Sequence, residues 1–320
     1  MSTSDSQVDT MIRQGMKDAF RPSFPLAVDS SMIAMFKSCQ QLAYKVSFQH
    51  WKSKEGANVH LTAGGAFAHG LEIGRRQFYE QEMPAEIAEA NALAALLQRY
   101  GSFQCPPDSA KSAERTAGAL EFYFDAYPLS NAAGYPILMP GGKRAIEVSF
   151  AHPLPIMHPE TGLPILYVGR ADMICQYAGG NYIEDDKTTS SLGPTWSRQW
   201  DLRGQFLGYT WGFRELGFDV RGVLVRGVSI LKTRYDTQEA ICNFSDFEVT
   251  RWYTEMLEWL DDMKTCWKTG RWRYNLDHAC TEYGGCGFRT VCKSQDETPW
   301  LEQYFERRSW DPVLRVETRL

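Results

Sequence analysis

A turn between two β-rich segments limits the fold of this chain more than any other feature. Residues 164–176 and 181–188 have the apolar and β-branched content of strands. Between them, Ala178-Gly179-Gly180-Asn181 is typical of the turn of a hairpin. The pattern therefore predicts an antiparallel hairpin, in which side chains alternate between two faces.

The predicted hairpin brings together residues that can bind a cation. Asp185 and Lys187 point to one face, and Asp172 near the end of the first strand can lie beside Asp185. Two close carboxylates repel unless a cation lies between them. Mg²⁺ binds carboxylates, waters and phosphate oxygens and lowers the pKa of a bound water, which Lys187 could then orient. The alternative is a hairpin with a solvated acidic face, because Asp-x-Lys often occurs by chance.

The segments before and after the hairpin indicate an α/β fold. We expect helices over 10–19, 32–46, 62–81, 85–100, 109–125, 194–217 and 247–267, and further strands over 143–151 and 220–232. This order predicts one mixed sheet flanked by helices, with an α-helical N-terminal part. We expect a flexible arm over 1–28, a single domain over 29–292 and a C-terminal tail with a short helix over 293–320.

Composition restricts the setting in which the protein works. The chain has 320 residues, of which 43% are hydrophobic, but no apolar run is long enough to cross a membrane. Its first nine residues lack the apolar stretch of a signal peptide, so we expect a cytoplasmic protein. The net charge of −5 argues mildly against a general nucleic-acid binder, although a local basic groove is compatible with it.

Two further features concern polar residues on predicted helices. Gln205 and Tyr209 are four residues apart and share one helix face. By themselves they fit an ordinary amphipathic helix. His69 follows small residues that allow its helix to approach a neighbour closely; a lone helical histidine is usually structural, but a neutral imidazole is also a good metal ligand.

Taken in order, these motifs resemble a known family. They are His69, Gly169-Arg170-Ala171-Asp172, Asp185-Asp186-Lys187 and Gln205-Phe206-Leu207-Gly208-Tyr209. The series resembles that of RecB-like nucleases of the PD-(D/E)xK superfamily, which have the restriction-endonuclease-like fold. The resemblance extends over residues 31–292. Within the family, the chain resembles CRISPR-associated and AddB-type exonuclease domains and phage-encoded relatives.

The resemblance implies a role for each matching residue. His69, Asp172, Asp185 and the backbone carbonyl of Asp186 would bind Mg²⁺ or Mn²⁺, and Lys187 would be the catalytic lysine. The remaining pair, Gln205 and Tyr209, would contact the DNA backbone or organise the site. The family implies a DNA nuclease, mainly an exonuclease, that acts on single strands or free ends in recombination, repair or phage DNA metabolism, with protein partners in recombination or replication.

A cysteine cluster near the C-terminus predicts a second metal centre. Cys280, Cys286 and Cys292 lie within thirteen residues, and thiolates favour zinc or iron–sulfur clusters, which normally need four ligands. Iron–sulfur members of the RecB-like family resemble this chain, and in them an early cysteine, here Cys39, would complete a [4Fe–4S] site. Zn²⁺ with His278 in place of Cys39 is the alternative. The other four of the eight cysteines are expected to be buried thiols: Cys105, Cys175, Cys242 and Cys266.

Basic and aromatic residues near the predicted site are candidates for contacts with single-stranded nucleic acid. They are Arg75, Arg76, Lys187, Arg198, Arg203 and Arg214, with Trp196, Trp200 and Trp211. Ordinary helix surfaces and cores contain the same residue types, so no single one is assigned. A non-catalytic nucleic-acid-binding or scaffold protein that keeps the nuclease fold is the alternative function, and loss of a site residue would favour it.

Overall fold

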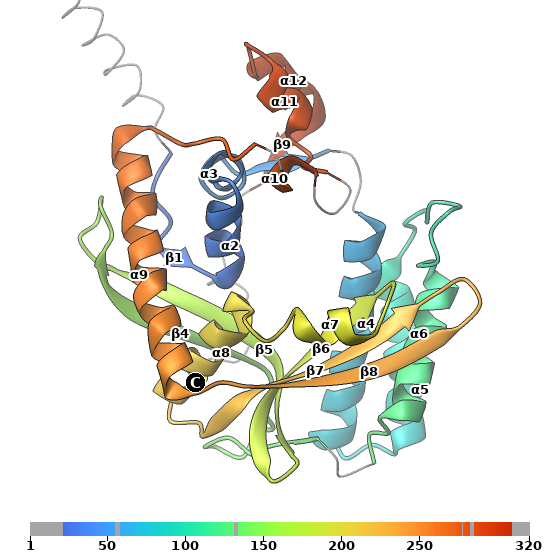
Figure 1. Ribbon diagram of the computed structural model, residues 1–320. Coiled ribbons are helices and arrows are strands. Elements are labelled where there is room, and N and C mark those ends of the chain that lie inside the picture. Colours follow the sequence, from blue (N-terminus) through green and yellow to red (C-terminus); the bar gives the residue numbers. More distant parts are fainter. Residues whose placement is uncertain (1–21, 55–57, 131–133, 277, 282–284, 309–320) are drawn as a thin grey trace, which may run out of the picture. The chain divides into compact units, whose positions relative to one another are not determined.

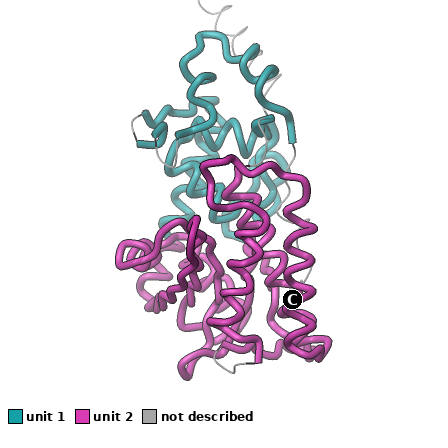
Figure 2. The backbone as a smooth tube through the Cα atoms, turned by 90° about the vertical axis from the view of Figure 1, so that its right-hand side faces the viewer, with its two compact units in different colours: residues 1–55, 152–167, 254–312 teal, residues 56–151, 168–253, 313–320 magenta. Residues whose placement is uncertain are grey.

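The computed structural model describes residues 22–54, 58–130, 134–276, 278–281 and 285–308. The chain forms two compact units, coloured separately in Figure 2. Unit 1 comprises residues 1–55, 152–167 and 254–312, and unit 2 comprises residues 56–151, 168–253 and 313–320. Two strands and one long helix pass from one unit to the other.

One mixed sheet of seven strands dominates the fold (Figure 1). Its path is β1-β5-β6-β7-β8, and β3 and β4 also pair with β5. The β5–β6 and β7–β8 pairs are antiparallel, whereas β6 and β7 run parallel. The strands of the sheet are β1 (Ala27–Val28), β3 (Tyr135–Pro136), β4 (Ile146–Met157), β5 (Pro164–Tyr177), β6 (Gly180–Thr189), β7 (Val220–Ile230) and β8 (Tyr235–Asn243).

Helices accompany this sheet, which confirms the predicted α/β class with its helical N-terminal part. In unit 2 they are α4 (Val59–Tyr79), α5 (Ala85–Tyr100), α6 (Ala113–Ala126), α7 (Pro194–Arg198) and α8 (Gly204–Glu215). A buried apolar cluster joins α4, α5 and α6 to Val228 and Ile230 of β7. Close packing there depends on Gly70, because a Cβ would lie only 2.7 Å from the Ala92 carbonyl oxygen.

Unit 1 is built mainly from short elements around the end of a long helix. They are α2 (Ser30–Ser38), α3 (Gln40–Ala43), a π-helix η1 (Tyr44–Phe48), β2 (Trp51–Ser53), α10 (His278–Thr281), α11 (Arg289–Lys293), α12 (Thr298–Tyr304) and β9 (Phe305–Arg307), with most of α9 (Asp246–Thr269). Asp29 caps the N-terminus of α2, since its carboxylate accepts the Met32 N–H at 2.8 Å. Phe288 and Phe305 stack at 4.4 Å and close a small apolar core.

Three local predictions were wrong. The expected helix over 32–46 breaks at Cys39, whose backbone is extended (φ −158°, ψ 118°). The expected helix over 194–217 is two helices, because the helical conformation ends at Arg198 and the chain is extended at Arg203 (φ −70°, ψ 116°) before α8 begins. Strand β8 was missed, because its exposed charged residues conceal the apolar alternation at the sheet edge.

Other predictions fall outside what the structure tests. The expected helix over 10–19 and the end of the tail, 309–320, lie outside the described residues, although α12 and β9 occupy part of the expected tail. The domain boundaries at 29 and 292 stay predictions. None of the described helices is long and apolar enough to cross a bilayer.

Candidate functional sites

The hairpin of β5 and β6 has the predicted form. Its turn residues, Ala178 and Gly179, both have left-handed backbone angles (φ 46° and 75°), as a two-residue turn between twisted strands requires. Met173 pairs with Glu184 in the antiparallel register. The backbone N–H of Asp186 donates to Asp172 Oδ2 at 3.0 Å, so the two strand segments with candidate ligands are in direct contact.

Asp185 and Lys187 share one face of β6, as alternation predicts, and form an ion pair. Burial, and then the charge of Asp185, raises the pKa of Asp172 to about 7. Burial also raises the pKa of Asp185. Although burial alone would lower the pKa of Lys187, attraction by Asp185 and Asp172 raises it, so the lysine stays protonated. One ammonium faces two carboxylates here, and a further cation would stabilise their ionised forms.

A third carboxylate, Glu147 on β4, belongs to the same site and was missed in the sequence. Its side chain is 8% exposed and pairs with Arg170 Nε at 2.9 Å. Burial, and then the charge of Asp172, raises the pKa of Glu147 to about 8. Its backbone is left-handed (φ 53°), a conformation that is strained for a residue with a side chain. An acidic residue inside the apolar run 145–150 was the available signal.

His69 lies on α4 at the edge of this group. Its side chain is 41% exposed, and Nδ1 lies 3.9 Å from Glu72 Oε2. Glu72 in turn contributes to the raised pKa of Glu147, after burial and Asp172. The structure therefore brings Asp172, Asp185, Lys187 and Asp186 together, whereas the contact that His69 makes is with Glu72. Its role as a metal ligand stays a prediction.

Gln205 and Tyr209 are joined on α8, where Gln205 Nε2 donates to Tyr209 Oη at 3.1 Å. The tyrosine ring lies edge-on to Phe150 at 6.3 Å. Both rings also pack against Gly169, where a Cβ would lie 2.5 Å from Phe150 and 3.0 Å from Tyr209. The glycine of the Gly169-Arg170-Ala171-Asp172 segment thus admits α8 to the strand that carries Asp172.

Several residues considered for nucleic-acid contact have structural roles instead. Arg75 is buried between Glu184 and Asp186, so it is no longer a candidate for contact with nucleic acid. Arg214 donates to the carbonyl oxygens of Val220 and Phe244. Trp196 and Trp200 are buried. The exposed arginines Arg198 and Arg203 remain candidates for contact with nucleic acid. The positive charge of Arg203 also partly offsets the effect of burial on the pKa of Asp185.

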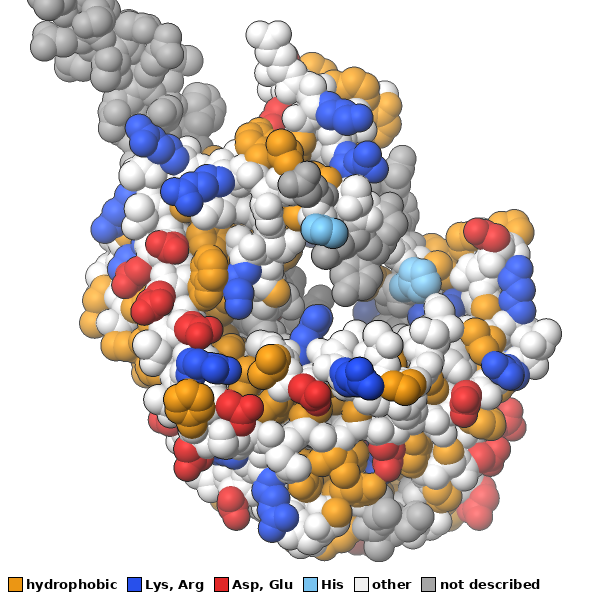
Figure 3. All heavy atoms as spheres, in the orientation of Figure 1, with side chains coloured by type: hydrophobic (Ala, Val, Ile, Leu, Met, Phe, Trp, Pro, Cys, Tyr) orange, Lys and Arg blue, Asp and Glu red, His pale blue; other side chains and the backbone are white. Residues whose placement is uncertain are grey.

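Acidic side chains gather on the exposed face of α9, at the left of Figure 3. They include Glu255, Glu258, Asp261 and Asp262, all in unit 1. A polyanion would be repelled by this surface. We therefore exclude the exposed face of α9 as a nucleic-acid interface.

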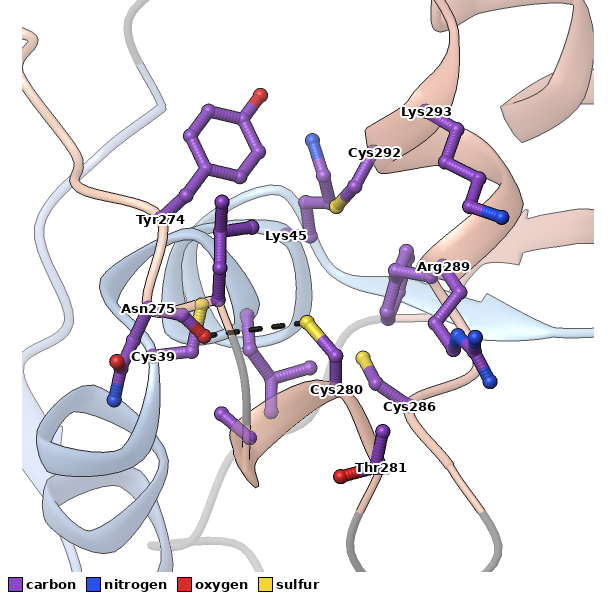
Figure 4. A pocket seen from close by; sticks show the side chains of 14 residues that line it. Cys39, Lys45, Tyr274, Asn275, Cys280, Thr281, Cys286, Arg289, Cys292 and Lys293 are labelled. Atoms are coloured by element: carbon purple, nitrogen blue, oxygen red, sulfur yellow. Dashed lines mark hydrogen bonds between the residues drawn. The ribbon is translucent and has the colours of Figure 1, made fainter.

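Four cysteines line one cavity of about 290 Å³ in unit 1 (Figure 4). Cys39 reaches it from the break between α2 and α3, and the others come from α10, the following loop and α11. Burial, and then interaction with Cys280 and Cys39, raises the pKa of Cys286. Burial and nearby charges, including those of Cys286 and Cys39, raise the pKa of Cys292 to about 11.

The donor set of this cavity fits a thiolate-bound metal centre. Four thiols are the number that a closed zinc or iron–sulfur site needs, and no disulfide joins any of the eight cysteines. His278, the alternative ligand, is exposed and does not line the cavity. Within the described residues, no three His, Cys, Asp or Glu side chains are already arranged as a metal-binding group, so ligands would have to move closer together at either site.

Comparison with known proteins does not place the chain in a family. No family model and no curated protein matches it. The crystal structure of a provisionally assigned exonuclease from Eubacterium rectale is 12% identical, covers 79% of this chain and 86% of that chain, and has a TM-score of 0.48. The crystal structure of SSO0001 is 16% identical, covers 71% of this chain and 84% of that chain, and has a TM-score of 0.27. Likeness at this level does not indicate what the chain does.

Proposed function

We propose that the protein is a Mg²⁺- or Mn²⁺-dependent nuclease of RecB-like type that hydrolyses DNA. The observation that carries the proposal is the group formed by Asp172, Asp185 and Lys187 on two paired strands. Burial and mutual repulsion raise the pKa of Asp172 to about 7, so the metal-free site has more negative charge than its lysine can balance. A divalent cation held by these carboxylates would remove that excess.

The residues of the site have distinct tasks in this proposal. Asp172, Asp185, the Asp186 carbonyl and His69 would hold the ion, which supplies Lewis acidity and lowers the pKa of bound water. Lys187, protonated beside Asp185, can orient the attacking water or neutralise charge on the phosphate. Gln205 and Tyr209 would contact the DNA backbone or organise the site.

The finer proposal is an exonuclease that acts on single-stranded DNA or free ends in recombination, repair or phage DNA metabolism, together with protein partners. We also propose that the protein works in the cytoplasm, where cysteine thiols stay reduced, as the eight free cysteines of this chain are. In unit 1, Cys39, Cys280, Cys286 and Cys292 would hold a [4Fe–4S] cluster that keeps the N-terminal helices and the C-terminal segment together. The thiol count and the shared cavity support this second part of the proposal.

The test uses end-labelled linear DNA and circular DNA, each in single-stranded and duplex form, with Mg²⁺, Mn²⁺ or a chelator. We expect metal-dependent digestion of linear DNA and little attack on circles. Asp185→Asn should lower the rate at least about 10³-fold, because it removes a charged metal ligand without changing the side-chain shape.

The matched control is Asp219→Asn, which makes the same charge change at an exposed position of unit 2. It should cleave at the parent rate. An Asp185→Asn protein that cleaves as well as the parent would refute the site. A parent protein that binds DNA but never cleaves it with any metal would favour the non-catalytic alternative.

A further inference from the structure

The second face of β6 carries a buried ionic network that the proposed chemistry does not use. Glu184 and Asp186 point to this face, and their side chains are 0% and 1% exposed. Arg75 of α4 contacts both carboxylates, with Nη1 lying 2.7 Å from Asp186 Oδ2. Arg226 of β7 adds contacts to Glu184 at 3.2 Å and to Glu239 at 2.9 Å.

Tyr123 of α6 completes the network around Asp186. Its hydroxyl donates to Asp186 Oδ1 at 2.5 Å and accepts from Arg75 Nη2 at 3.2 Å. Both oxygens of the Asp186 carboxylate are therefore bound, one by an arginine and one by a tyrosine. A single residue of the strand is held from two helices at once.

A network of this kind is a poor source of stability. Removing several charges from water costs free energy that their mutual attraction barely offsets, and apolar residues of similar volume would often stabilise the fold as well or better. The three carboxylates and two guanidinium groups of this network are better explained if they fix the positions of strand β6 and helix α4.

Asp186 connects the two faces of the strand. Arg75 and Tyr123 hold its side chain on one face. Its backbone N–H donates to Asp172 Oδ2, which belongs to the proposed metal site with Asp185 and Lys187. Asp185 and Lys187 are its immediate neighbours, so restraint at 186 also restrains the peptide groups that direct their side chains. The network thus acts on Asp172 through one hydrogen bond and on Asp185 through one peptide.

Arg75 also links this strand to the helix that carries His69. Both residues lie on α4, and the arginine attaches that helix to Glu184 and Asp186 of β6. Only a planar, forked group can contact two carboxylates and a tyrosine in this way, which a lysine ammonium cannot reproduce.

We propose that Arg75 and Tyr123 are positioning residues that hold Asp186 and helix α4 so that Asp172, Asp185 and His69 can close on one metal ion. The inference rests on the proposed nuclease function. Groups behind metal ligands typically change metal affinity by 10–100-fold when they are lost. A network that merely stabilised the fold would change the unfolding temperature and leave the metal affinity of the folded protein unaltered.

Tyr123→Phe is the main test, because it removes one hydrogen bond to Asp186 without leaving a buried charge unpaired. Mn²⁺ affinity is measured by titration calorimetry without DNA, and the site is identified as the binding that Asp185→Asn abolishes. We expect about 10-fold weaker binding. The Mn²⁺ concentration for half-maximal cleavage should rise by the same factor, with the KM for DNA unchanged and the rate restored by excess Mn²⁺.

The matched control is Tyr79→Phe. Tyr79 lies on α4 beside the same network, but its hydroxyl donates to the Leu129 carbonyl at 2.9 Å instead of to Asp186. This variant should bind Mn²⁺ like the parent. Arg75→Lys should weaken binding more than Tyr123→Phe, and circular dichroism shows whether it folds; if it does not, the tyrosine pair still decides the question.

The outcomes separate this inference from the proposed function. A parent that cleaves DNA, with a Tyr123→Phe variant that binds Mn²⁺ equally well, overturns the positioning role alone. A parent that binds Mn²⁺ at the Asp185-dependent site but cleaves nothing refutes the nuclease, while the Tyr123→Phe titration still tests the positioning. A parent without Asp185-dependent Mn²⁺ binding overturns both.

Discussion

The carboxylate site of unit 2 and the cysteine cavity of unit 1 are built in opposite ways. Asp172, Asp185 and Lys187 lie on two paired strands joined by a two-residue turn, so backbone hydrogen bonds set their spacing. The four cysteines come from short helices and loops at distant parts of the sequence. The first site is fixed by local pairing, whereas the second depends on tertiary contacts.

This difference suggests that the two sites depend on metal differently. A hairpin within a large sheet can form before any cation binds, and the cation then relieves repulsion. A cavity of about 290 Å³ lined by thiols lacks internal packing, and a bound centre would replace the missing contacts. The catalytic metal would therefore act mainly on activity, and the thiolate-bound centre mainly on stability.

The largest effect on metal content and stability is expected from Cys39→Ser, which tests the structural role of the cysteine cavity. Loss of one of four ligands should abolish the brown colour and stoichiometric iron of anaerobically purified protein. Unit 1 should lose several kcal/mol of stability, on the order of that contributed by structural metals. Iron analysis, visible absorbance and thermal unfolding check the prediction.

Cys266→Ser is the control for that experiment. Cys266 also lies in unit 1, but its thiol contacts Gln40 Oε1 at 3.5 Å and does not line the cavity. It should retain iron and stability. Colourless parent protein with stoichiometric zinc would contradict the iron–sulfur assignment, and equal stability of both variants would contradict the structural role.

A smaller effect is expected from the pH dependence of the carboxylate site. The pKa of Asp172 is about 7 in the fold and about 4 in an unfolded chain, so the folded state holds the proton more tightly. Its contribution to stability is present below pH 4 and is lost as pH rises towards 7. Asp172→Asn, which cannot ionise, should therefore stabilise the metal-free protein at pH 8 by up to about 4 kcal/mol, and by little at pH 4.

Chemical denaturation at both pH values, with and without Mn²⁺, measures this effect. Added Mn²⁺ should stabilise the parent at pH 8 and not Asp172→Asn. If the variant is less stable than the parent at pH 8 without metal, the ionised form of Asp172 does not destabilise the metal-free fold, contrary to the prediction.

The sequence was sufficient for features that depend on neighbouring residues. The hairpin, the shared face of Asp185 and Lys187, and the pairing of Gln205 with Tyr209 follow from turn chemistry and periodicity. The α/β class followed from the order of these elements. His69 and the metal identities stay predictions, because they concern distances across the fold and ligands that the protein must bind.

Features that depend on distant partners were missed or misread. Glu147 resembled an ordinary strand residue until β4 was placed beside Asp172. Arg75 resembled a surface arginine, because its partners come from β6 and α6. The break at Cys39 interrupts an apolar helical pattern without a proline or glycine, and it matters because it turns the thiol into the cavity.

Anomalous diffraction from crystals soaked in Mn²⁺ tests the central claim most directly. We predict a peak within bonding distance of Asp172 and Asp185, on the face of β6 that carries Lys187. The peak should disappear in Asp185→Asn and persist in Asp219→Asn. Crystals that take up Mn²⁺ elsewhere and show no peak between Asp172 and Asp185, from protein that still cleaves DNA, would contradict the account.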